Sequence, residues 1–414
     1  MVVAAIRFLL ASDALVALAL PLTILLICWR HIPWPTYTDI KDFILLGRRP
    51  KRVRASYFSL ERAFRSYEQY AQLSAKEVGQ MRRSYNTLTR ANTNLGNKIG
   101  YSKKLGRLHD VTSMNAVITN AIVGLALEEF QELETVHLVD VGLADLGRVR
   151  EALKHFIRDW STEGEVERTR IFKPILELLK EVNEEERGNL KVLVPGCGLG
   201  RLAWEISELG FETTANELSF FMTLAFRFLL SPTTTTTPNE HSLRPYSHWF
   251  SHQRTNDSLF RRLPFPDVVP RLGPKLHLLE QDFLTIPAPP SLSWDKATPA
   301  SASEGGYDYI VTLFFIDTSL DVFTTMRHIY NLLRPGGIWI NLGPLLWTGG
   351  GQAKVELSLD EVLKAAEEIG FFISNETEGP TARRTVECEY TGDRNAMMRW
   401  IYRAEFWVGH KSKA

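Results

Sequence analysis

The clearest fold signal in this chain is the sequence Lys191-Val-Leu-Val-Pro-Gly-Cys-Gly-Leu-Gly-Arg-Leu. Its apolar start predicts a buried strand, and residues 201–209 predict the helix that follows. Gly196, Gly198 and Gly200 lie between them, where the backbone must turn sharply and approach a ligand closely. The stretch therefore predicts a cofactor loop between a strand and a helix. The alternative is a glycine turn needed only for packing.

Acidic residues follow at positions that suit an adenosine-containing cofactor. Glu217 stands about twenty residues after Gly196, at the end of the next predicted strand, where a carboxylate can accept hydrogen bonds from both ribose hydroxyls. Asp282 and Phe283 follow a third predicted strand, 276–279, where an acid and an aromatic ring meet the adenine amino group and ring. For Asp282 the alternative is an ordinary aspartate at a strand end.

The glycine spacing separates two cofactor classes. Gly-x-Gly-x-Gly lacks the third glycine where a dinucleotide motif has it, and a pyrophosphate also needs donors at the helix start. An abrupt turn at 334–337 before an apolar strand, 338–342, accompanies methyltransferase sheets, as does a closing antiparallel pair, 384–390 with 400–410. These features favour S-adenosylmethionine. A nicotinamide-dependent oxidoreductase is the alternative.

Strands and helices alternate from residue 147 onward, which is typical of a parallel sheet with both faces covered. We expect an α/β fold: a Rossmann-like methyltransferase sheet over 147–414, mostly parallel with an antiparallel closing strand. Insertions are expected near 231–274, whose threonine run we predict to be disordered, and near 287–306. Residues 31–146 are predicted to form a helical cap, because apolar residues recur at helical spacing there.

Residues 1–30 form a separate apolar segment. Its uninterrupted core, 14–29, is shorter than the roughly twenty residues of a spanning helix and longer than a signal-peptide core requires. Lysines and arginines follow it, so the positive-inside rule would keep the bulk of the protein cytosolic. We expect a cytoplasmic enzyme, with residues 1–30 either a membrane anchor or a non-spanning extension.

The composition argues against nucleic acid as a partner. Lysine plus arginine and aspartate plus glutamate number 48 each, so the chain lacks the positive charge that binds phosphates. A small or peptide-sized substrate fits better. Cys28, Cys197 and Cys388 are far apart, so we expect no zinc site, no disulfide framework and a reducing compartment. The sequence makes no prediction of the oligomeric state.

Separated motifs between residues 56 and 410 resemble those of the carnosine N-methyltransferase family. They are Ile157-Arg-Asp-Trp, Leu193-Val-Pro-Gly-Cys-Gly-Leu-Gly-Arg-Leu-Ala-Trp-Glu, Asn216-Glu-Leu-Ser-Phe-Phe-Met, Phe265-Pro-Asp-Val, Phe314-Phe-Ile-Asp-Thr and Trp339-Ile-Asn-Leu-Gly-Pro-Leu-Leu. The resemblance implies transfer of a methyl group from S-adenosylmethionine to an imidazole nitrogen of β-alanyl-histidine, giving anserine, on a Rossmann-like domain preceded by helices.

The resemblance also implies a set of cofactor contacts. His155 stands where the family has Gln; either can donate a hydrogen bond, although a protonated His would be less welcome beside a sulfonium. For Arg158 the alternative is a salt bridge on a helix surface. The cofactor residues that the resemblance implies are Arg158, Gly196, Glu217, Asp282, Phe283 and Leu313.

The substrate residues implied by the resemblance are Asp317, Tyr390 and Tyr402. Since the sulfonium is already activated, the protein mainly has to hold a neutral nitrogen against the methyl group. Asp317 can accept the proton of the other ring nitrogen, which fixes the tautomer and stabilises the cation that forms. The tyrosine hydroxyls can orient the ring or the dipeptide. The alternative is two tyrosines packing at the rim of the sheet.

One departure from the family concerns the substrate. The family carries a His shortly after Gly-Pro-Leu-Leu, whereas this chain reads Trp347-Thr-Gly-Gly-Gly, and Thr348 cannot replace an imidazole. His328 is better explained as a surface or packing residue of helix 321–333. The alternatives to carnosine methylation are therefore another imidazole compound, a protein histidine, or a non-catalytic S-adenosylmethionine-binding scaffold.

Overall fold

The computed structural model describes residues 58–135, 144–290, 305–347, 352–374 and 376–412. They belong to the unit Tyr57–Ala414, to which the description below is confined. Segment 1–30, Thr348 and most of the expected loop 287–306 lie outside the described residues, so the expectations about them stay predictions.

Helices make up the described part of the region before the sheet, as the apolar spacing predicts. They are α4 (Leu60–Glu68), α5 (Tyr70–Asn86), α6 (Arg90–Lys98), α7 (Tyr101–Glu129) and the 3-10 turn η1 (Gln131–Thr135). The chain then runs through α8 (Leu146–Trp160), η2 (Thr162–Gly164), α9 (Glu165–Lys180) and α10 (Glu184–Arg187).

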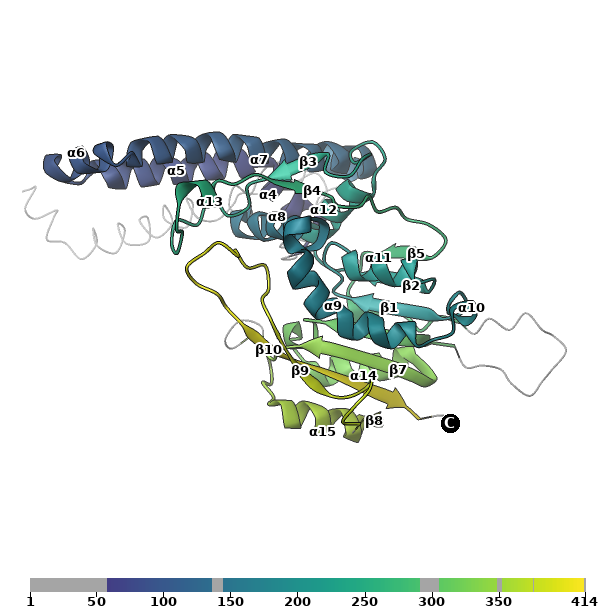
Figure 1. Cartoon of the computed structure of the whole chain (residues 1–414). Coiled ribbons are helices and arrows are strands. Elements are labelled where there is room, and N and C mark those ends of the chain that lie inside the picture. The colour runs from purple at the N-terminus through teal and green to yellow at the C-terminus, as the bar shows by residue number, and fades with distance from the viewer. Residues whose placement is uncertain (1–57, 136–143, 291–304, 348–351, 375, 413–414) are drawn as a thin grey trace, which may run out of the picture. The chain divides into compact units, whose positions relative to one another are not determined.

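An eight-stranded sheet follows (Figure 1). Its strands are β1 (Lys191–Pro195), β2 (Glu212–Asn216), β5 (Leu276–Leu279), β6 (Tyr307–Leu313), β7 (Leu333–Gly343), β8 (Phe371–Ile373), β9 (Arg384–Cys388) and β10 (Tyr402–Lys411). The order is β5-β2-β1-β6-β7-β10-β8, and β9 pairs with β10. The pairs from β5 to β7 are parallel, whereas β10 runs antiparallel to β7, β8 and β9. This confirms the predicted Rossmann-like sheet and its antiparallel closing pair.

Alternating side chains of the central strands fill two cores, one on each face of the sheet. Val192 and Val194 of β1 join the core under α9 and α11 (Arg201–Glu208). Leu193, between them, joins the core under α14 (Val322–Leu332) and α15 (Leu359–Ile369). The apolar run that predicted this strand is thus explained by burial on both faces.

Residues 334–337 do not form the abrupt turn that the sequence predicted. Leu333–Gly343 is one continuous strand, and 334–337 bulges within it, because Tyr307 pairs with Leu333 while Tyr309 already pairs with Ile338. Gly336 has φ +77°, which a glycine adopts without strain. The prediction of an abrupt turn was therefore wrong; proline and paired glycine here permit a bulge.

The prediction of a disordered threonine run was also wrong. The run follows α12 (Phe220–Leu230), and the hydroxyls of Thr234 and Thr235 both donate to the carbonyl oxygen of Phe228. They satisfy a carbonyl that the end of a helix leaves without an intrahelical partner. Thr235 is fully buried. The rest of the insertion supplies β3 (His241–Leu243), α13 (Asn256–Leu259) and β4 (Leu263–Phe265).

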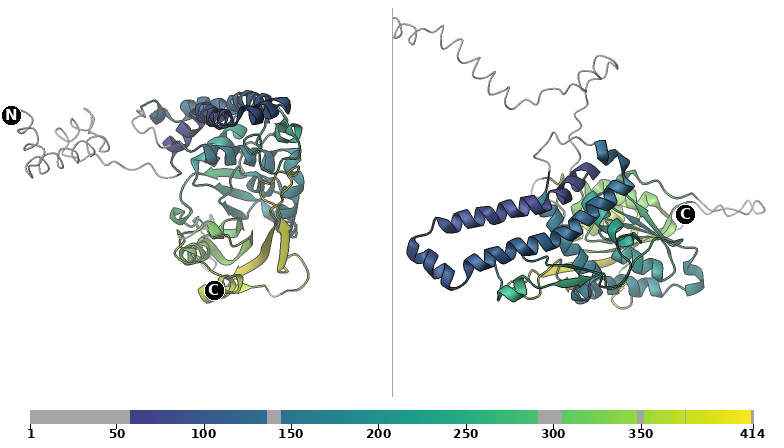
Figure 2. Two further views of the ribbon diagram at one scale, coloured as in Figure 1. Left: turned by 90° about the vertical axis from the view of Figure 1, so that its left-hand side faces the viewer. Right: turned by 90° about the horizontal axis from the view of Figure 1, so that it is seen from above.

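Helix α7 meets the length and hydropathy of a membrane span, and half of its most apolar stretch is buried inside the protein. It lies beside α5 (Figure 2). Ile118, Ile122 and Leu125 join the core shared with α4, α8 and α12. The apolar character of α7 is therefore that of a core helix.

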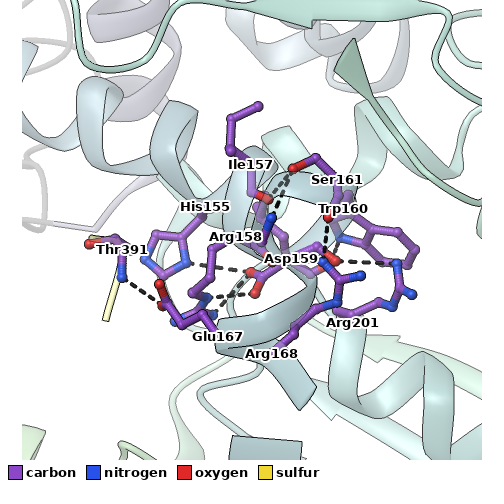
Figure 3. A network of polar contacts seen from close by, with 12 residues as sticks. His155, Ile157, Arg158, Asp159, Trp160, Ser161, Glu167, Arg168, Arg201 and Thr391 are labelled. Carbon is purple, nitrogen blue, oxygen red and sulfur yellow. Dashed lines mark hydrogen bonds and ion pairs between the residues drawn. The ribbon is translucent and has the colours of Figure 1, made fainter. Parts of the chain in front are cut away.

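One carboxylate ties three helices to the insertion. Asp267 accepts hydrogen bonds from Arg168 of α9 at 2.7 Å and from Arg201 of α11 at 2.6 Å. Its backbone N–H donates to the carbonyl oxygen of Trp160, at the end of α8, at 2.8 Å. Figure 3 shows Arg168, Arg201 and Trp160 close to one another. The indole N–H of Trp160 also donates to the carbonyl oxygen of Leu199, in the glycine loop, at 2.8 Å.

Asp267→Ala should lower the free energy of unfolding by about 3 kcal/mol, because the buried guanidinium of Arg168 loses its carboxylate and that of Arg201 keeps only Glu205. Urea denaturation measures the change. Asp257→Ala is the matched control: Asp257 pairs with Arg107 at 3.1 Å, but its side chain is 92% exposed. Removing such a surface pair should cost less than about 1 kcal/mol. Equal losses in the two variants would contradict the assignment.

Candidate active site

The predicted cofactor residues meet at one edge of the sheet, where the carboxyl ends of its parallel strands lie. Gly196 directly follows β1, Glu217 follows β2, Asp282 comes shortly after β5 and Leu313 ends β6. In open α/β sheets, ligands bind in the crevice outside these strand ends. The structure thus brings together residues that are more than a hundred positions apart in sequence.

Each glycine of the loop has a different neighbour. Gly196, Gly198 and Gly200 all have positive φ, at +63°, +59° and +74°. A Cβ atom on Gly200 would overlap the ring of Phe226, and one on Gly196 would lie 2.6 Å from the ring of Phe315. A Cβ on Gly198 would meet nothing within 4 Å. Packing therefore explains two of the glycines, while Gly198 faces open space in which a ligand can approach the backbone.

Glu217 is hydrogen-bonded to the glycine loop and to the residues that follow β2. One of its carboxylate oxygens accepts from the N–H of Gly198 at 2.9 Å and the other from the N–H of Ser219 at 2.8 Å. Burial raises the pKa of Glu217, and the two backbone N–H groups oppose that rise. Since each carboxylate oxygen has two lone pairs, both can accept one more hydrogen bond. A pair of neighbouring hydroxyls matches this arrangement.

Asp282 and Phe283 have different surroundings. Asp282 is exposed and accepts from the N–H of Leu284 at 3.0 Å, at the start of η3 (Phe283–Thr285). The ring of Phe283 is buried, edge-on to Phe315 and His328 at 5.3 and 4.9 Å. Asp282 thus faces solvent at the strand ends, whereas the Phe283 ring supports the site from the core. His328 is a packing residue, as expected.

A buried ion pair lies on the inner side of α8 (Figure 3). Arg158 donates to both carboxylate oxygens of Asp159, at 2.6 and 3.0 Å. Both side chains are buried, so the alternative of a surface salt bridge for Arg158 is wrong. Burial alone would raise the pKa of Asp159, but the Arg158 guanidinium holds it well below its usual range.

His155 lies beside this pair, with Nδ1 3.5 Å from Asp159 Oδ2. Burial lowers the pKa of His155, and the charge of Arg158 lowers it further. The imidazole is therefore neutral at physiological pH. A protonated His at this position would repel a sulfonium, whereas a neutral ring adds no positive charge beside it.

An aromatic cluster brings the two predicted tyrosines together. The ring of Tyr390 stacks on Phe314, with centroids 4.8 Å apart, and the guanidinium of Arg158 lies 4.5 Å from the Tyr390 centroid. Tyr402 meets Phe314 edge-on at 5.7 Å. Phe314 has φ +51°, a left-handed conformation that costs energy in a residue with a Cβ. This strained residue joins the cofactor edge to both tyrosines.

Asp317 lies within η4 (Ile316–Thr318), three residues after Phe314. It is 5% exposed, and Oδ2 accepts from the N–H of Leu346 at 2.9 Å. Burial raises the pKa of Asp317 to about 6. The pKa of Tyr402 is raised by burial and then by the charge of Asp317, because the two groups are near one another. At pH 7 the carboxylate is mostly ionised and can accept an N–H.

The sequence reading missed the residues that hold this site in place. Asp159 and Asp267 stand inside quoted motifs, 157–160 and 265–268, but nothing in their spacing indicated a shared network. Phe314 opens another quoted motif, yet only its backbone conformation explains its place. Glu167 accepts from the N–H of Thr391 at 2.7 Å and anchors the segment after Tyr390.

Metal or thiol sites would be built from the two described cysteines and from the acidic and histidine side chains. Among the described residues, no cluster of three or more His, Cys, Asp and Glu side chains could hold a metal ion. Cys197 and Cys388 are free, and burial raises the pKa of both thiols. Neither is a ready thiolate nucleophile.

Asp317→Asn should stabilise the fold at pH 8. The folded pKa of Asp317, about 6, exceeds its unfolded value of 3.8, so an ionised Asp317 weakens the fold above pH 6 and this penalty is relieved as pH falls toward 4. The gain should be on the order of 2 kcal/mol at pH 8 and shrink by pH 4. Denaturation at both pH values measures it.

Asp321→Asn is the control for that prediction. Asp321 caps α14 by accepting from the N–H of Thr324, and this bond lowers its pKa. This variant should therefore show no gain at pH 8. A gain equal to that of Asp317→Asn, or one independent of pH, would contradict burial as the cause.

Comparison with known proteins identifies the family to which this chain belongs. The model of the family described as Carnosine N-methyltransferase matches residues 136–413. A protein named carnosine N-methyltransferase from Schizosaccharomyces pombe is 30% identical over 85% of this chain and 94% of its own length. The mouse protein of that name is 31% identical over 73% of this chain and 72% of its own. A solved magnesium protoporphyrin IX methyltransferase from Synechocystis aligns with 12% identity, a TM-score of 0.35, and coverage of 64% of this chain and 93% of its own. The chain belongs to the carnosine N-methyltransferase family.

Proposed function

We propose that this chain is an S-adenosylmethionine-dependent methyltransferase that methylates an imidazole nitrogen of carnosine and so makes anserine. Its family membership supports the reaction. The observation that carries the assignment to residues is the continuous contact from Arg158 through Tyr390 and Phe314 to Tyr402, which lies near Asp317. These contacts connect the sheet edge that carries the glycine loop to Asp317, a buried carboxylate that can accept an imidazole N–H.

The residues at the cofactor edge fit S-adenosylmethionine, which supplies a methyl group already activated by a sulfonium. The open space at Gly198 admits the ligand, and the remaining lone pairs of Glu217 can accept the ribose hydroxyls. Asp282, exposed at the next strand end, can accept the adenine amino group. Arg158 already carries its counter-ion and His155 is neutral, so neither opposes a sulfonium.

On the substrate side, Asp317 positions the imidazole. Its carboxylate accepts the N–H of one ring nitrogen, so the other nitrogen keeps its lone pair and can attack the methyl group in line. After transfer, the ring is a cation, and Asp317 can stabilise it and take the remaining proton. Tyr390 and Tyr402 border the ring and can orient it through their hydroxyls.

The expected location remains a prediction. We expect the sheet and its site in the cytoplasm, with residues 1–30 as the segment that would attach them to a membrane. A small imidazole-containing molecule is the partner that this reaction requires.

Transfer of labelled methyl from S-adenosylmethionine should go to carnosine, with L-histidine and a histidine-containing protein as parallel acceptors. Label in carnosine alone is the expected result, because the family whose model matches this chain is described as carnosine N-methyltransferase. Label in another acceptor alone would move the assignment to that imidazole compound. Cofactor binding without transfer to any acceptor would indicate a scaffold.

Asp317→Ala and Glu217→Ala should separate chemistry from cofactor binding. Asp317→Ala should lower kcat by roughly a hundredfold or more and leave the Kd for S-adenosylhomocysteine nearly unchanged. Glu217→Ala should raise that Kd by roughly tenfold or more, because two charged acceptors are lost. Calorimetry measures binding, and Glu217→Gln should fall between wild type and Ala. Parallel losses of both properties in Asp317→Ala would show that this residue is structural.

A further inference from the structure

Helices α5 and α7 extend away from the sheet and carry α6 at their far end (Figure 2). Val78 of α5 and Leu105 of α7 are the last buried apolar residues before that end. Between them the structure buries only Gly96. Residues 79–104, the helical arm, therefore add no buried side chain to the hydrophobic cores, and local contacts must hold them in place.

Those local contacts are close. A Cβ on Gly96 would lie 2.3 Å from the hydroxyl oxygen of Tyr85, so α6 lies directly on α5. The same hydroxyl donates to the carbonyl oxygen of Thr93 at 2.8 Å, and the ring of Tyr85 lies 4.9 Å from that of Tyr101 at the start of α7. The three helices thus meet around one tyrosine, which fixes the surface that the end of the helical arm presents.

Three large apolar side chains of the helical arm face solvent. Leu88, Leu95 and Ile99 are 46%, 59% and 74% exposed. Single exposed apolar residues are common on proteins, but these three line one open hollow of about 710 Å³. Exposed apolar residues that share a surface in this way mark a site of interaction.

The helical arm is also basic. It holds six lysine and arginine residues and no aspartate or glutamate, whereas the two kinds of charge balance over the whole chain. Glu77, which lines the hollow from the adjoining turn of α5, is already paired with Arg150 at 2.6 Å. Lys104 lies over the ring of Phe250 at 3.9 Å. The remaining basic residues are all exposed: Arg82, Arg83, Arg90, Lys98 and Lys103.

An anionic lipid bilayer matches both properties of this surface. Its headgroups attract lysine and arginine, and the boundary with its acyl chains accepts apolar side chains. A nucleic acid would use the positive charge but leave the three apolar side chains without a partner. A second copy of the helical arm would cover them only by bringing like charges together, which is unfavourable. Charge and apolar surface together therefore favour lipid.

We propose that the helical arm docks on anionic lipid bilayers. Leu88, Leu95 and Ile99 enter the headgroup boundary, and the exposed basic residues contact the headgroups. This function goes beyond methyl transfer, because the helical arm contributes no residue to the candidate active site. It brings the catalytic sheet to a membrane surface by a route that does not require residues 1–30.

The test measures partition of the full chain into vesicles of phosphatidylcholine alone and of phosphatidylcholine mixed with phosphatidylserine. The ratio of the two partition coefficients cancels any attachment through residues 1–30 that is independent of lipid charge. For the wild type this ratio should be roughly a hundredfold or more at low salt, because several basic residues each contribute about fivefold. It should fall as salt is added.

Two double variants separate the charge from the apolar surface. Arg82→Glu with Arg83→Glu should lower the ratio at least roughly tenfold. Leu95→Ser with Ile99→Ser, which leaves the charge unchanged, should lower partition into the mixed vesicles by roughly tenfold. All variants should keep the wild-type Kd for S-adenosylhomocysteine, which shows that the fold is intact.

The matched controls lie outside the helical arm and should partition as the wild type does. Lys173→Glu with Lys354→Glu controls for charge, because these side chains are 65% and 72% exposed. Phe372→Ser of β8 controls for exposed apolar surface, because Phe372 is 69% exposed. Effects in the controls equal to those in the helical arm would overturn the proposal.

A wild-type ratio near one would also overturn the proposal, as would arginine or serine substitutions without effect. Two further measurements then identify the occupant. Binding of duplex DNA or RNA that is lost in the arginine variant and kept in the serine variant would indicate a nucleic acid. A dimer in sedimentation velocity without lipid, dissociated by the serine variant, would indicate a second copy of the chain.

Discussion

The buried pair of Arg158 and Asp159 is the interaction on which the rest of the site depends. Burying two charges costs several kcal/mol per ion unless the geometry is close to ideal and further hydrogen bonds support it. Here the pair is bidentate, and the backbone carbonyls of the same two residues accept from Arg168 and Arg201. The end of α8 is thereby fixed to α9 and α11. The same guanidinium lies over the ring of Tyr390, so one ion pair positions both the cofactor edge and the aromatic cluster.

The charges of the site follow from this arrangement. Arg158 is neutralised by Asp159, and burial keeps His155 uncharged, so the space near the expected sulfonium gains no net positive charge. Asp317, at the far end of the aromatic cluster, is ionised at pH 7 at some cost in stability, because burial raises its pKa to about 6. Perturbed groups of this kind concentrate at functional sites, where stability is traded for chemistry. Asp317 is thus a carboxylate whose ionisation weakens the fold, and it lies where it can hold an imidazole.

Local sequence patterns predicted the strands of the sheet, but they could not predict contacts between residues that are far apart in the sequence. The apolar run before Gly196 gave β1 because both faces of that strand are buried, and strand β5 was placed at its observed bounds. The prediction of disorder in the threonine run rested on composition alone. Composition does not show that the Thr235 hydroxyl donates to the carbonyl oxygen of Phe228. Asp317 and the two tyrosines came from family resemblance. No periodicity could reveal that Phe314 brings those tyrosines together, because this depends on a single strained φ angle.

Selectivity among methyl acceptors must come from parts of the chain outside the common sheet. The strand ends provide the glycine loop and Glu217, which suit any reaction that uses the same cofactor, and a fold alone does not define a substrate. The insertion and the segment joining β9 to β10 are the parts that reach beyond Tyr390, and Asp393 holds them together by accepting from Gln253 and Arg261. Tyr390 lies in that segment and stacks on Phe314, so differences in these two parts of the chain can change the surroundings of the aromatic cluster without changing the sheet.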